Sequence, residues 1–186
     1  LIFRDPARIE PLLHDRRIQL VFAGKNHPDD HGGRRIVANL VEMSRRYPHA
    51  VVFVPHYNME VGRLITRGAD VWLNNPVRPM EASGTSGMKA AMNGVLNLSV
   101  LDGWWPEACQ HGVNGWAIGD GSSDLPDQDH RDMESLLTVL EHEVLPAFAK
   151  RDRWVAMMGQ SIAMGEQMFS SDRMVQEYFD RLYVRG

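Results

Sequence analysis

Cysteine is almost absent from this chain of 186 residues, which contains a single thiol at Cys109. One cysteine cannot form an internal disulfide, and such sparing use is typical of proteins that fold in a reducing compartment. We therefore expect a cytoplasmic protein. We interpret Cys109 as chemically inert because no basic partner is apparent for it in the sequence.

Long apolar runs and an excess of basic charge are also lacking. The longest apolar runs, such as residues 50–54, are too short to cross a bilayer, so no membrane partner is expected. The formal net charge of -4 supplies no basic field, so nucleic acid is not expected as a partner either. The chain has no initiator Met and no signal-peptide pattern, and we expect it to be a piece of a longer protein.

The composition that is present is that of an ordinary globular domain, with 44% apolar and 24% charged residues. Short apolar segments alternate with amphipathic helical ones, and the segments that we expect to be strands are residues 18–24, 51–54, 69–73, 95–100 and 115–118. Strands separated by single helices predict an α/β fold with a doubly wound, Rossmann-like parallel sheet. Ligands of such sheets bind beyond the carboxyl ends of the strands, and we expect the loops that follow the strands to share this edge.

The character of the sequence changes near Gly119, after which we expect a helical C-terminal tail. We therefore divide the chain into a βα core, residues 1–118, and a helical tail, residues 119–186. One apolar stripe in this tail consists of Met133, Leu136, Leu137, Leu140 and Val144. A last helix, with Ser171 as its expected N-cap, places Tyr178, Phe179 and Tyr183 at positions that we expect to be core.

The most informative stretch runs from Glu81 to Gly94 and reads EASGTSGMKAAMNG. Its small residues, Gly84 and Gly87 among them, leave backbone N–H groups unshielded before a helix. A helix start offers unpaired donors and a positive dipole end, which together favour an anion such as phosphate. Lys89 follows one turn into this helix, flanked by Ala and Met, and is either a structural counter-ion or a reactive amine.

Two further groups of residues allow either a functional or a structural interpretation. Four residues after the first predicted strand are of types that bind metals: His27, Asp29, Asp30 and His31. No third distant ligand is indicated, so we favour a solvated loop and predict no metal site. Trp104 and Trp105 either form the rim of a sugar site or pack at the edge of the sheet.

The segment from Glu81 to Lys89, followed by Asn93-Gly94, resembles the pyridoxal-phosphate lysine segment of the α-glucan (glycogen, maltodextrin and starch) phosphorylases, in particular their short bacterial branch. The resemblance covers residues 20–183. It implies the GT-B glycosyltransferase fold, of which residues 1–186 would be a single, partial C-terminal domain. It also implies cleavage of α-1,4-glucans by phosphate to give glucose 1-phosphate.

In that family the active site lies between two domains. We therefore expect a missing N-terminal domain as a partner and negligible activity of the chain alone. We also expect self-association as a homo-oligomer through the apolar face meant for the missing domain.

The resemblance further assigns cofactor-binding roles to residues that match the family's motif. Lys89 would be the catalytic lysine that holds pyridoxal 5'-phosphate as a Schiff base. The backbone N–H groups of Thr85 and Ser86 would hold the cofactor's phosphate, and Tyr57 would lie against its ring. A lysine must be neutral to attack an aldehyde, so we expect Lys89 to be partly buried among its apolar neighbours.

The substrate would be held nearby, with Glu81 and the backbone of Ser83 and Gly84 on hydroxyls of the glucosyl unit. Two departures from the family pattern stand out. Ser86-Gly87 replaces the Gly-Asn of many members, and the basic stretch that clamps the phosphates is absent and is expected ahead of Leu1.

Two other functions compete with the phosphorylase interpretation. Nucleotide-sugar glycosyltransferases of the GT-B fold, such as glycogen and starch synthases, carry Glu-x₇-Glu at this place, whereas here the second position is Lys89. An ammonium group cannot accept a hydrogen bond from a ribose hydroxyl. A non-catalytic domain that binds phosphate or sugar is the third hypothesis, and we favour the phosphorylase.

Overall fold

The computed structural model describes residues 1–122 and 126–183. The chain forms two compact units: residues 2–65, here called the N-terminal unit, and Leu1 with the residues from Thr66 onward, here called the C-terminal unit. The two units meet between Ile65 and Thr66, whereas the predicted βα core and helical tail meet between residues 118 and 119. The grouping of the whole chain as one GT-B domain stays a prediction.

The N-terminal unit contains α1 (Pro6–His14), β1 (Leu20–Ala23), α2 (His31–Arg46), β2 (Val51–Val54) and the start of α3 (Met59–Gly68). The two strands pair in parallel. The Asp5 side chain caps α1 by accepting a hydrogen bond from the Arg8 N–H. The buried apolar residues of this unit come mainly from α1 and from the segment before β2, and they are Ile2, Ile9, Leu12, Leu13, Tyr47, Ala50 and Val51.

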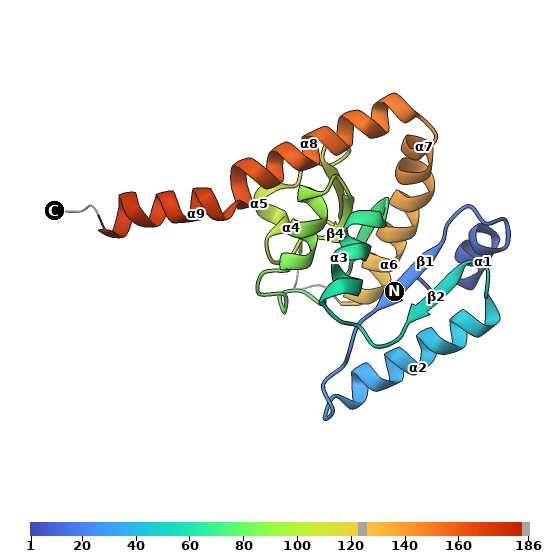
Figure 1. Ribbon diagram of the computed structural model, residues 1–186. Helices are drawn as coiled ribbons and strands as arrows, with labels where there is room; N and C mark the ends of the chain where they lie inside the picture. The colour runs from blue at the N-terminus through green and yellow to red at the C-terminus, as the bar shows by residue number, and fades with distance from the viewer. Residues whose placement is uncertain (123–125, 184–186) are drawn as a thin grey trace. The chain divides into compact units, whose positions relative to one another are not determined.

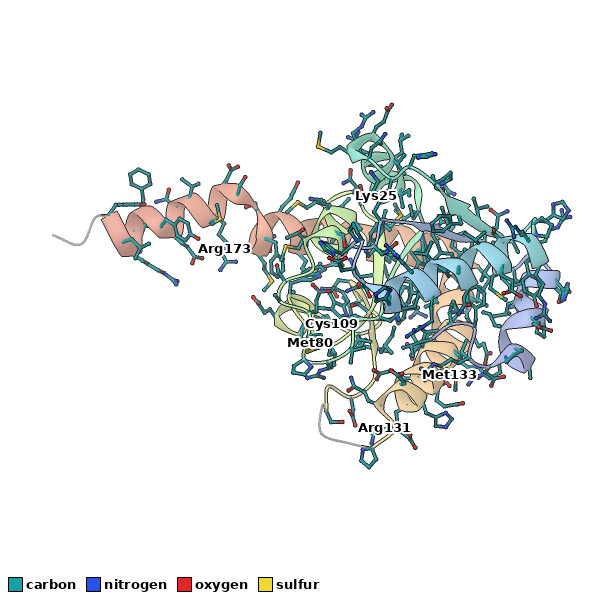
Figure 2. The ribbon with its side chains drawn as sticks, turned by 90° about the horizontal axis from the view of Figure 1, so that it is seen from below. Lys25, Met80, Cys109, Arg131, Met133 and Arg173 are labelled. Atoms are coloured by element: carbon teal, nitrogen blue, oxygen red, sulfur yellow. The ribbon has the colours of Figure 1, made fainter. Side chains whose placement is uncertain are left out.

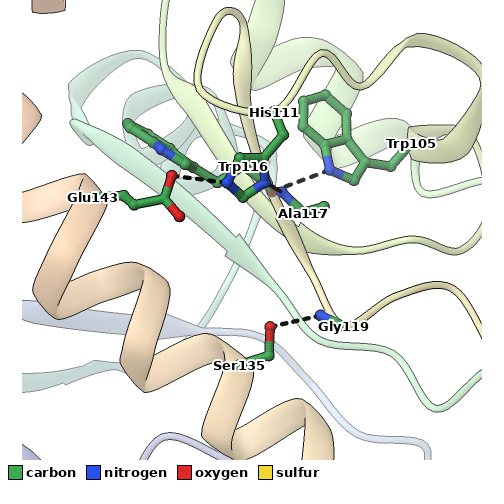
Figure 3. A network of polar contacts seen from close by, with 7 residues as sticks. All are labelled: Trp105, His111, Trp116, Ala117, Gly119, Ser135 and Glu143. Atoms are coloured by element: carbon green, nitrogen blue, oxygen red, sulfur yellow. Dashed lines mark hydrogen bonds and ion pairs between the residues drawn. The ribbon is translucent and has the colours of Figure 1, made fainter.

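The C-terminal unit contains a three-stranded parallel sheet in the order β3-β4-β5. Its elements are β3 (Val71–Asn74), α4 (Thr85–Met92), β4 (Leu96–Val100), α5 (Trp105–Ala108) and β5 (Gly115–Ile118). Every residue of the central strand β4 is buried, as expected for a strand that is covered on both faces. Trp105 anchors α5 to the sheet, because its indole N–H donates to the carbonyl of Trp116 in β5 at 3.2 Å (Figure 3).

Helices form the rest of the C-terminal unit: α6 (Gln128–Val139), the π-helix η1 (Leu140–Val144), α7 (Leu145–Phe148), α8 (Arg151–Phe169), α9 (Ser171–Tyr178) and the π-helix η2 (Phe179–Tyr183). The helix α8 packs across α4, and α6 packs against β5 (Figure 1). The five apolar residues of the predicted stripe in α6 and η1 are all buried, which confirms that prediction.

The prediction that the last helix contributes core residues is wrong. Tyr178, Phe179 and Tyr183 are 49%, 55% and 72% exposed. Their spacing gives an apolar stripe on α9 and η2, but Figure 1 shows this helix projecting from the end of α8. The N-cap is Ser170, one residue before the predicted Ser171, and its hydroxyl accepts from the Arg173 N–H at 3.2 Å.

All five predicted strands exist and pair in parallel, so the α/β class is confirmed. They are hydrogen-bonded as a two-stranded and a three-stranded sheet. Their union in one doubly wound sheet stays a prediction. Within residues 1–122 and 126–183, no helix is long and apolar enough to cross a membrane.

Candidate functional site

The bend before α4 leads into a helix whose N-cap residue supplies no capping side chain. Gly84 is the N-cap residue and has a left-handed backbone with φ of 86°, a conformation that glycine adopts without a steric penalty. Because glycine has no side chain, it makes no side-chain cap bond to the first turn. Thr85 and Ser86, the first two helical residues, are both exposed. Their backbone N–H groups therefore lie at the positive end of α4, where an anion is favoured.

A close-packed floor lies beneath this bend. A Cβ at Gly87 would lie 2.8 Å from Oδ1 of Asn97 and 2.9 Å from the indole nitrogen of Trp104, so only glycine fits there. Asn97 is fully buried in β4, and its side-chain amide donates to the Gly87 carbonyl at 3.1 Å. Trp104 is 2% exposed and also lies 3.2 Å from the Cβ position of Gly84. The floor thus fixes both glycines of the bend.

The loop after β4 holds the start of the bend from the side. The carboxylate of Asp102 accepts the backbone N–H of Glu81 and that of Gly103, each at 2.9 Å. The Trp104 N–H donates to the carbonyl of Ser83 at 2.9 Å. The prediction that the loops after the strands share one edge is therefore confirmed for those that follow β3 and β4.

The approach of these two loops depends on Gly103, which has φ of 57°. A Cβ at that position would lie 2.5 Å from the Ser83 carbonyl oxygen and 2.9 Å from Cγ of Glu81. Glu81, Ser83 and Gly84, the three predicted sugar-binding residues, thus lie together. The carbonyl oxygen of Ser83 accepts one hydrogen bond, from the backbone N–H of Trp104, and a carbonyl oxygen has a second lone pair that can accept from a ligand.

Lys89 is exposed, so the expectation of a partly buried lysine is wrong for this chain. The physical reason is the helical period: α4 buries Gly87, Ala90 and Ala91 on its inner face, and Lys89 falls on the opposite face. Asn93 fixes the end of this outer face, because its side-chain amide donates to the Lys89 carbonyl at 2.7 Å and its oxygen accepts from Nε of Arg67 at 3.2 Å.

Tyr57 belongs to the N-terminal unit, whereas Lys89 belongs to the C-terminal unit. The tyrosine is 37% exposed, and its hydroxyl oxygen lies 2.6 Å from the Cβ position of Gly62 in α3. Its contact with the cofactor ring stays a prediction. Lys25 follows β1 and is exposed in the same unit.

The residues that look like a metal cluster have local structural roles. Asp30 is the N-cap of α2, where its Oδ1 accepts from the Gly33 N–H at 2.8 Å. Nδ1 of His27 accepts from the backbone N–H of Asp29 at 3.2 Å. In the described part of the chain, no three His, Cys, Asp or Glu side chains gather closely enough to hold a metal ion.

Trp104 and Trp105 are both buried, so the packing interpretation is the correct one and they form no rim. They belong to a core cluster with Ala91, Ala108 and Met164. Cys109, which is labelled in Figure 2, packs against this cluster. Burial raises the pKa of the Cys109 thiol to about 12, which agrees with the interpretation of this cysteine as inert.

Sequence reasoning placed the loop at Asp102 on the ligand-binding edge but did not foresee the hydrogen bonds that Asp102 accepts, and it missed the supporting residue Asn97. Asn97 stands inside an apolar strand, where a polar residue has to find a buried partner. The presence of a polar residue in an apolar strand is the only local sign in the sequence that Asn97 supports the bend. Asp102 follows a strand directly, at the edge where ligands are expected, and its position is therefore informative only once the topology is known.

Comparison with known proteins finds a match to the family model of carbohydrate phosphorylases over residues 11–111. The chain is 44% identical to a maltodextrin phosphorylase of Thermococcus litoralis, over all of this chain and 23% of that protein. It is 44% identical to a glycogen phosphorylase of Mycobacterium bovis, over 99% of this chain and 23% of that protein. It is 41% identical to a glycogen phosphorylase of Aquifex aeolicus, over all of this chain and 28% of that protein.

The chain thus spans about a quarter of the length of these relatives, with shares of 23% and 28%. These matches favour the phosphorylase interpretation over the nucleotide-sugar alternative. The family model covers the whole of the bend, the floor beneath it and the loop after β4. Together with the bend itself, the match places this chain in the carbohydrate phosphorylase family.

Proposed function

We propose that this chain is the cofactor-bearing part of an α-1,4-glucan phosphorylase that depends on pyridoxal 5'-phosphate. The reaction of the whole enzyme would transfer a terminal glucosyl unit of an α-1,4-glucan to inorganic phosphate and release glucose 1-phosphate. The single observation that carries the proposal is the uncapped start of α4 at Gly84, with Lys89 one turn further along the same helix.

The residues of the bend fit a phosphate ester. The cofactor's phosphate would accept hydrogen bonds from the backbone N–H groups of Thr85 and Ser86, which are exposed and lie at the positive end of the helix dipole. The floor of Trp104 and Asn97 supports this fit, because it packs against Gly87 on the inner face of α4 and fixes the start of the helix from that side. Thr85 and Ser86 are exposed, so a ligand can approach the start of the helix from the other side.

Lys89 would be the attachment point of the cofactor. The exposure of Lys89 keeps its amine accessible to an aldehyde, although α4 alone does not supply apolar surroundings for it. When bound, the cofactor supplies a phosphate group with a second pKa of about 6, which suits proton exchange with a substrate phosphate near neutrality.

The glucosyl unit would lie beside the bend. The carboxylate of Glu81 can accept hydrogen bonds from sugar hydroxyls, and the backbone of Ser83 and Gly84 offers further polar contacts. The two hydrogen bonds that Asp102 accepts, from Glu81 and Gly103, hold these groups in a fixed arrangement before substrate arrives.

We further propose that the GT-B architecture applies, with residues 1–186 in its C-terminal domain, a second domain opposite the bend, and Tyr57 against the cofactor ring. The length of the matched relatives supports a partner domain, because each is about four times as long as this chain according to the share of 23%. Self-association of the chain stays a prediction.

Selective labelling of one lysine tests the proposal. The protein is incubated with pyridoxal phosphate, reduced with borohydride and mapped by peptide analysis. The chain has only three lysines, Lys25, Lys89 and Lys150, and all three are exposed. Accessibility alone would label them alike, so a label confined to Lys89 requires the phosphate site at the start of α4.

Matched variants complete this experiment. We expect Lys89→Arg to abolish the selective label. Lys25→Arg should leave it unchanged, because the helix start that follows Lys25, that of α2, is already capped by Asp30. Inorganic phosphate should compete with labelling of Lys89 by occupying the N–H groups at the start of α4.

Lys150 is the most demanding control, because it is itself the N-cap residue of α8 and makes no side-chain cap bond. It therefore lies at a second open helix start, but without the glycine bend and without a lysine one turn further along. We expect little label at Lys150. Equal labelling of the three lysines, or of Lys89 and Lys150, would contradict the proposal.

A further inference from the structure

Two backbone N–H groups on the outer edge of β5 are bonded to side chains. The strand lies at one end of the three-stranded sheet, so only one of its edges pairs with β4. On the other edge, the N–H of Ala117 donates to Nδ1 of His111 at 3.1 Å (Figure 3). Just past the strand, the N–H of Gly119 donates to the hydroxyl oxygen of Ser135 in α6 at 2.8 Å. An unpaired strand edge is a template for pairing with another strand, and here two side chains occupy it.

The two acceptors differ in their chemistry. The hydroxyl of Ser135 does not titrate, whereas a histidine ring nitrogen accepts a hydrogen bond only while it has no proton. Because Nδ1 of His111 accepts from Ala117, the proton of the neutral ring is on Nε2. This Nε2 lies 2.8 Å from Oε2 of Glu143, in position to donate to it. The two neighbours of the ring therefore fix one tautomer.

Protonation of His111 would change one of these contacts and keep the other. The side chain is 43% exposed, so protons from solvent reach it. An imidazolium donates from both nitrogens, so Nδ1 would turn its own proton toward the N–H of Ala117 and the hydrogen bond would be lost. The contact with the carboxylate of Glu143 would become an ion pair that holds the protonated ring. Imidazole side chains change charge between about pH 5 and 8, so the exchange of contacts falls near physiological pH.

The charged groups around His111 come from η1 and α8, because β5 reads Gly-Trp-Ala-Ile and has no titratable side chain. Glu143 belongs to η1, and in the described part of the chain its ion pair is the only one that His111 makes. Two further titratable residues of η1 lie with Nε2 and Oε2 4.0 Å apart, and they are His142 and Glu141. From α8, Nη2 of Arg153 lies 4.0 Å from the Cβ position of Gly112, the residue after His111. The carboxylate of Glu143 is thus the charged group in direct contact with the ring.

The loop that carries His111 is held independently of the bond to Ala117. The side-chain oxygen of Asn114 accepts from the N–H of Gln110 at 2.9 Å, and its amide donates to the carbonyl of Ala108 at 2.9 Å. Asn114 is 3% exposed, and its amide does not titrate. Loss of the bond between the ring and Ala117 would therefore free an N–H on the edge of β5 without unfolding the loop.

We propose that His111 is a pH-sensitive switch on the edge of β5. When neutral, its ring accepts the N–H of Ala117; when protonated, it keeps its contact with Glu143 and releases that N–H to solvent. The bond from Gly119 to Ser135 persists in both states. The switch needs no cofactor, so it can be tested independently of the proposed function.

Amide hydrogen exchange measured by NMR at pH 8 and pH 5 tests the switch, with each rate corrected for the intrinsic pH dependence of exchange. We expect the protection factor of Ala117 to fall about fivefold or more at pH 5, as for the loss of one hydrogen bond. The protection factor of Gly119 should not change, because its acceptor does not titrate. The nitrogen chemical shifts of the His111 ring should indicate a proton on Nε2 alone at pH 8 and on both nitrogens at pH 5.

Variants at the two contacts separate the switch from a general effect of acid. His111→Asn has no group that titrates in this range, so the protection of Ala117 should no longer depend on pH. Glu143→Gln keeps an acceptor for Nε2 but removes the charge that holds the imidazolium, so the release should require a lower pH. His142→Asn changes an exposed histidine of the same π-helix and should alter neither result. Thermal unfolding at both pH values verifies that each variant is folded.

Three outcomes would overturn the proposal. One is an equal loss of protection at Ala117 and Gly119, which would mean that acid loosens the whole edge. Another is a pH dependence at Ala117 that persists in the His111→Asn variant. The third is unchanged protection of Ala117 at a pH at which the ring carries both protons. Labelling of Lys89 by pyridoxal phosphate is a separate measurement, so this proposal and the proposed function can fail separately.

Discussion

The inner and outer faces of α4 differ sharply in how they are constrained. On the inner face, Gly87, Ala90 and Ala91 are buried against a floor in which Trp104 and Asn97 leave no room for larger side chains. The outer face presents Thr85, Ser86 and Lys89 to solvent. The comparison shows that the packing of the buried face alone can fix the position of α4. The backbone N–H groups of Thr85 and Ser86 and the amine of Lys89 then have defined positions although they face solvent.

The largest effect is expected from removing the floor itself. Trp104→Ala deletes a side chain that is 2% exposed and contacts both glycines of the bend. Loss of a buried tryptophan leaves a cavity and should lower the free energy of unfolding by about 3–5 kcal/mol. Urea denaturation measures this change, with the midpoint and the slope analysed separately.

An exposed aromatic residue provides the matched control for this prediction. Phe179 is 55% exposed on η2, so Phe179→Ala should change the free energy of unfolding by no more than about 0.5 kcal/mol. If the two variants lost similar stability, the contrast between a packed floor and open surfaces would not hold.

A smaller effect is expected from adding one methyl group between α4 and its floor. Gly87→Ala would place Cβ 2.8 Å from Oδ1 of Asn97 and 2.9 Å from the indole nitrogen of Trp104. Overpacking of this kind should destabilise the protein by about 1–3 kcal/mol. Because the substitution also shifts the start of α4, selective labelling of Lys89 by pyridoxal phosphate should weaken in parallel.

Gly159 in α8 allows the same substitution without the clash. Nothing lies within 4 Å of its Cβ position, so Gly159→Ala should stabilise the helix. The expected gain is about 0.5–1 kcal/mol, because alanine loses less conformational freedom than glycine. Thermal unfolding of the Gly87→Ala and Gly159→Ala variants gives the comparison. If both substitutions stabilised the protein, or if both destabilised it, the expected contrast between the two glycines would be contradicted.

The strands can be predicted from the sequence because each is a short apolar run bounded by turn residues. The predicted strands at residues 51–54 and 115–118 have the observed bounds, and the other three agree to within two residues at each end. The bend before α4 can also be predicted, because glycine and other small residues directly before a helical segment are typical of a tight turn at a helix start.

The surroundings of the bend cannot be predicted, because they depend on tertiary contacts. The neighbours of Lys89 in the sequence are apolar, but the helical period turns them inward and leaves the lysine outside. The aromatic stripe on η2 illustrates the same limit, since the period of a stripe shows which residues share a face but not what covers them. Asp102 has no local pattern that announces its bonds to Glu81 and Gly103.

The last prediction is chemical and concerns Cys109, which packs against the core cluster that includes Ala91 of α4. Burial raises the pKa of this thiol from 9.0 to about 12, so its thiolate is scarce in the native protein. At pH 9 we expect iodoacetamide to modify Cys109 at least about 100-fold more slowly in the native than in the unfolded chain, since each pKa unit changes the thiolate fraction about tenfold. Exposed Lys89 should react with amine reagents without unfolding.

The same pKa difference predicts how stability changes with pH. Between pH 9.0 and about 12 the unfolded thiol has lost its proton, whereas the native thiol retains it. The native state therefore binds more protons, and stability falls as pH rises through this window. Cys109→Ala should remove this part of the slope, measured by urea denaturation at several pH values. An unchanged slope would mean that water reaches the thiol and that the core cluster around Cys109 is less closed than its packing indicates.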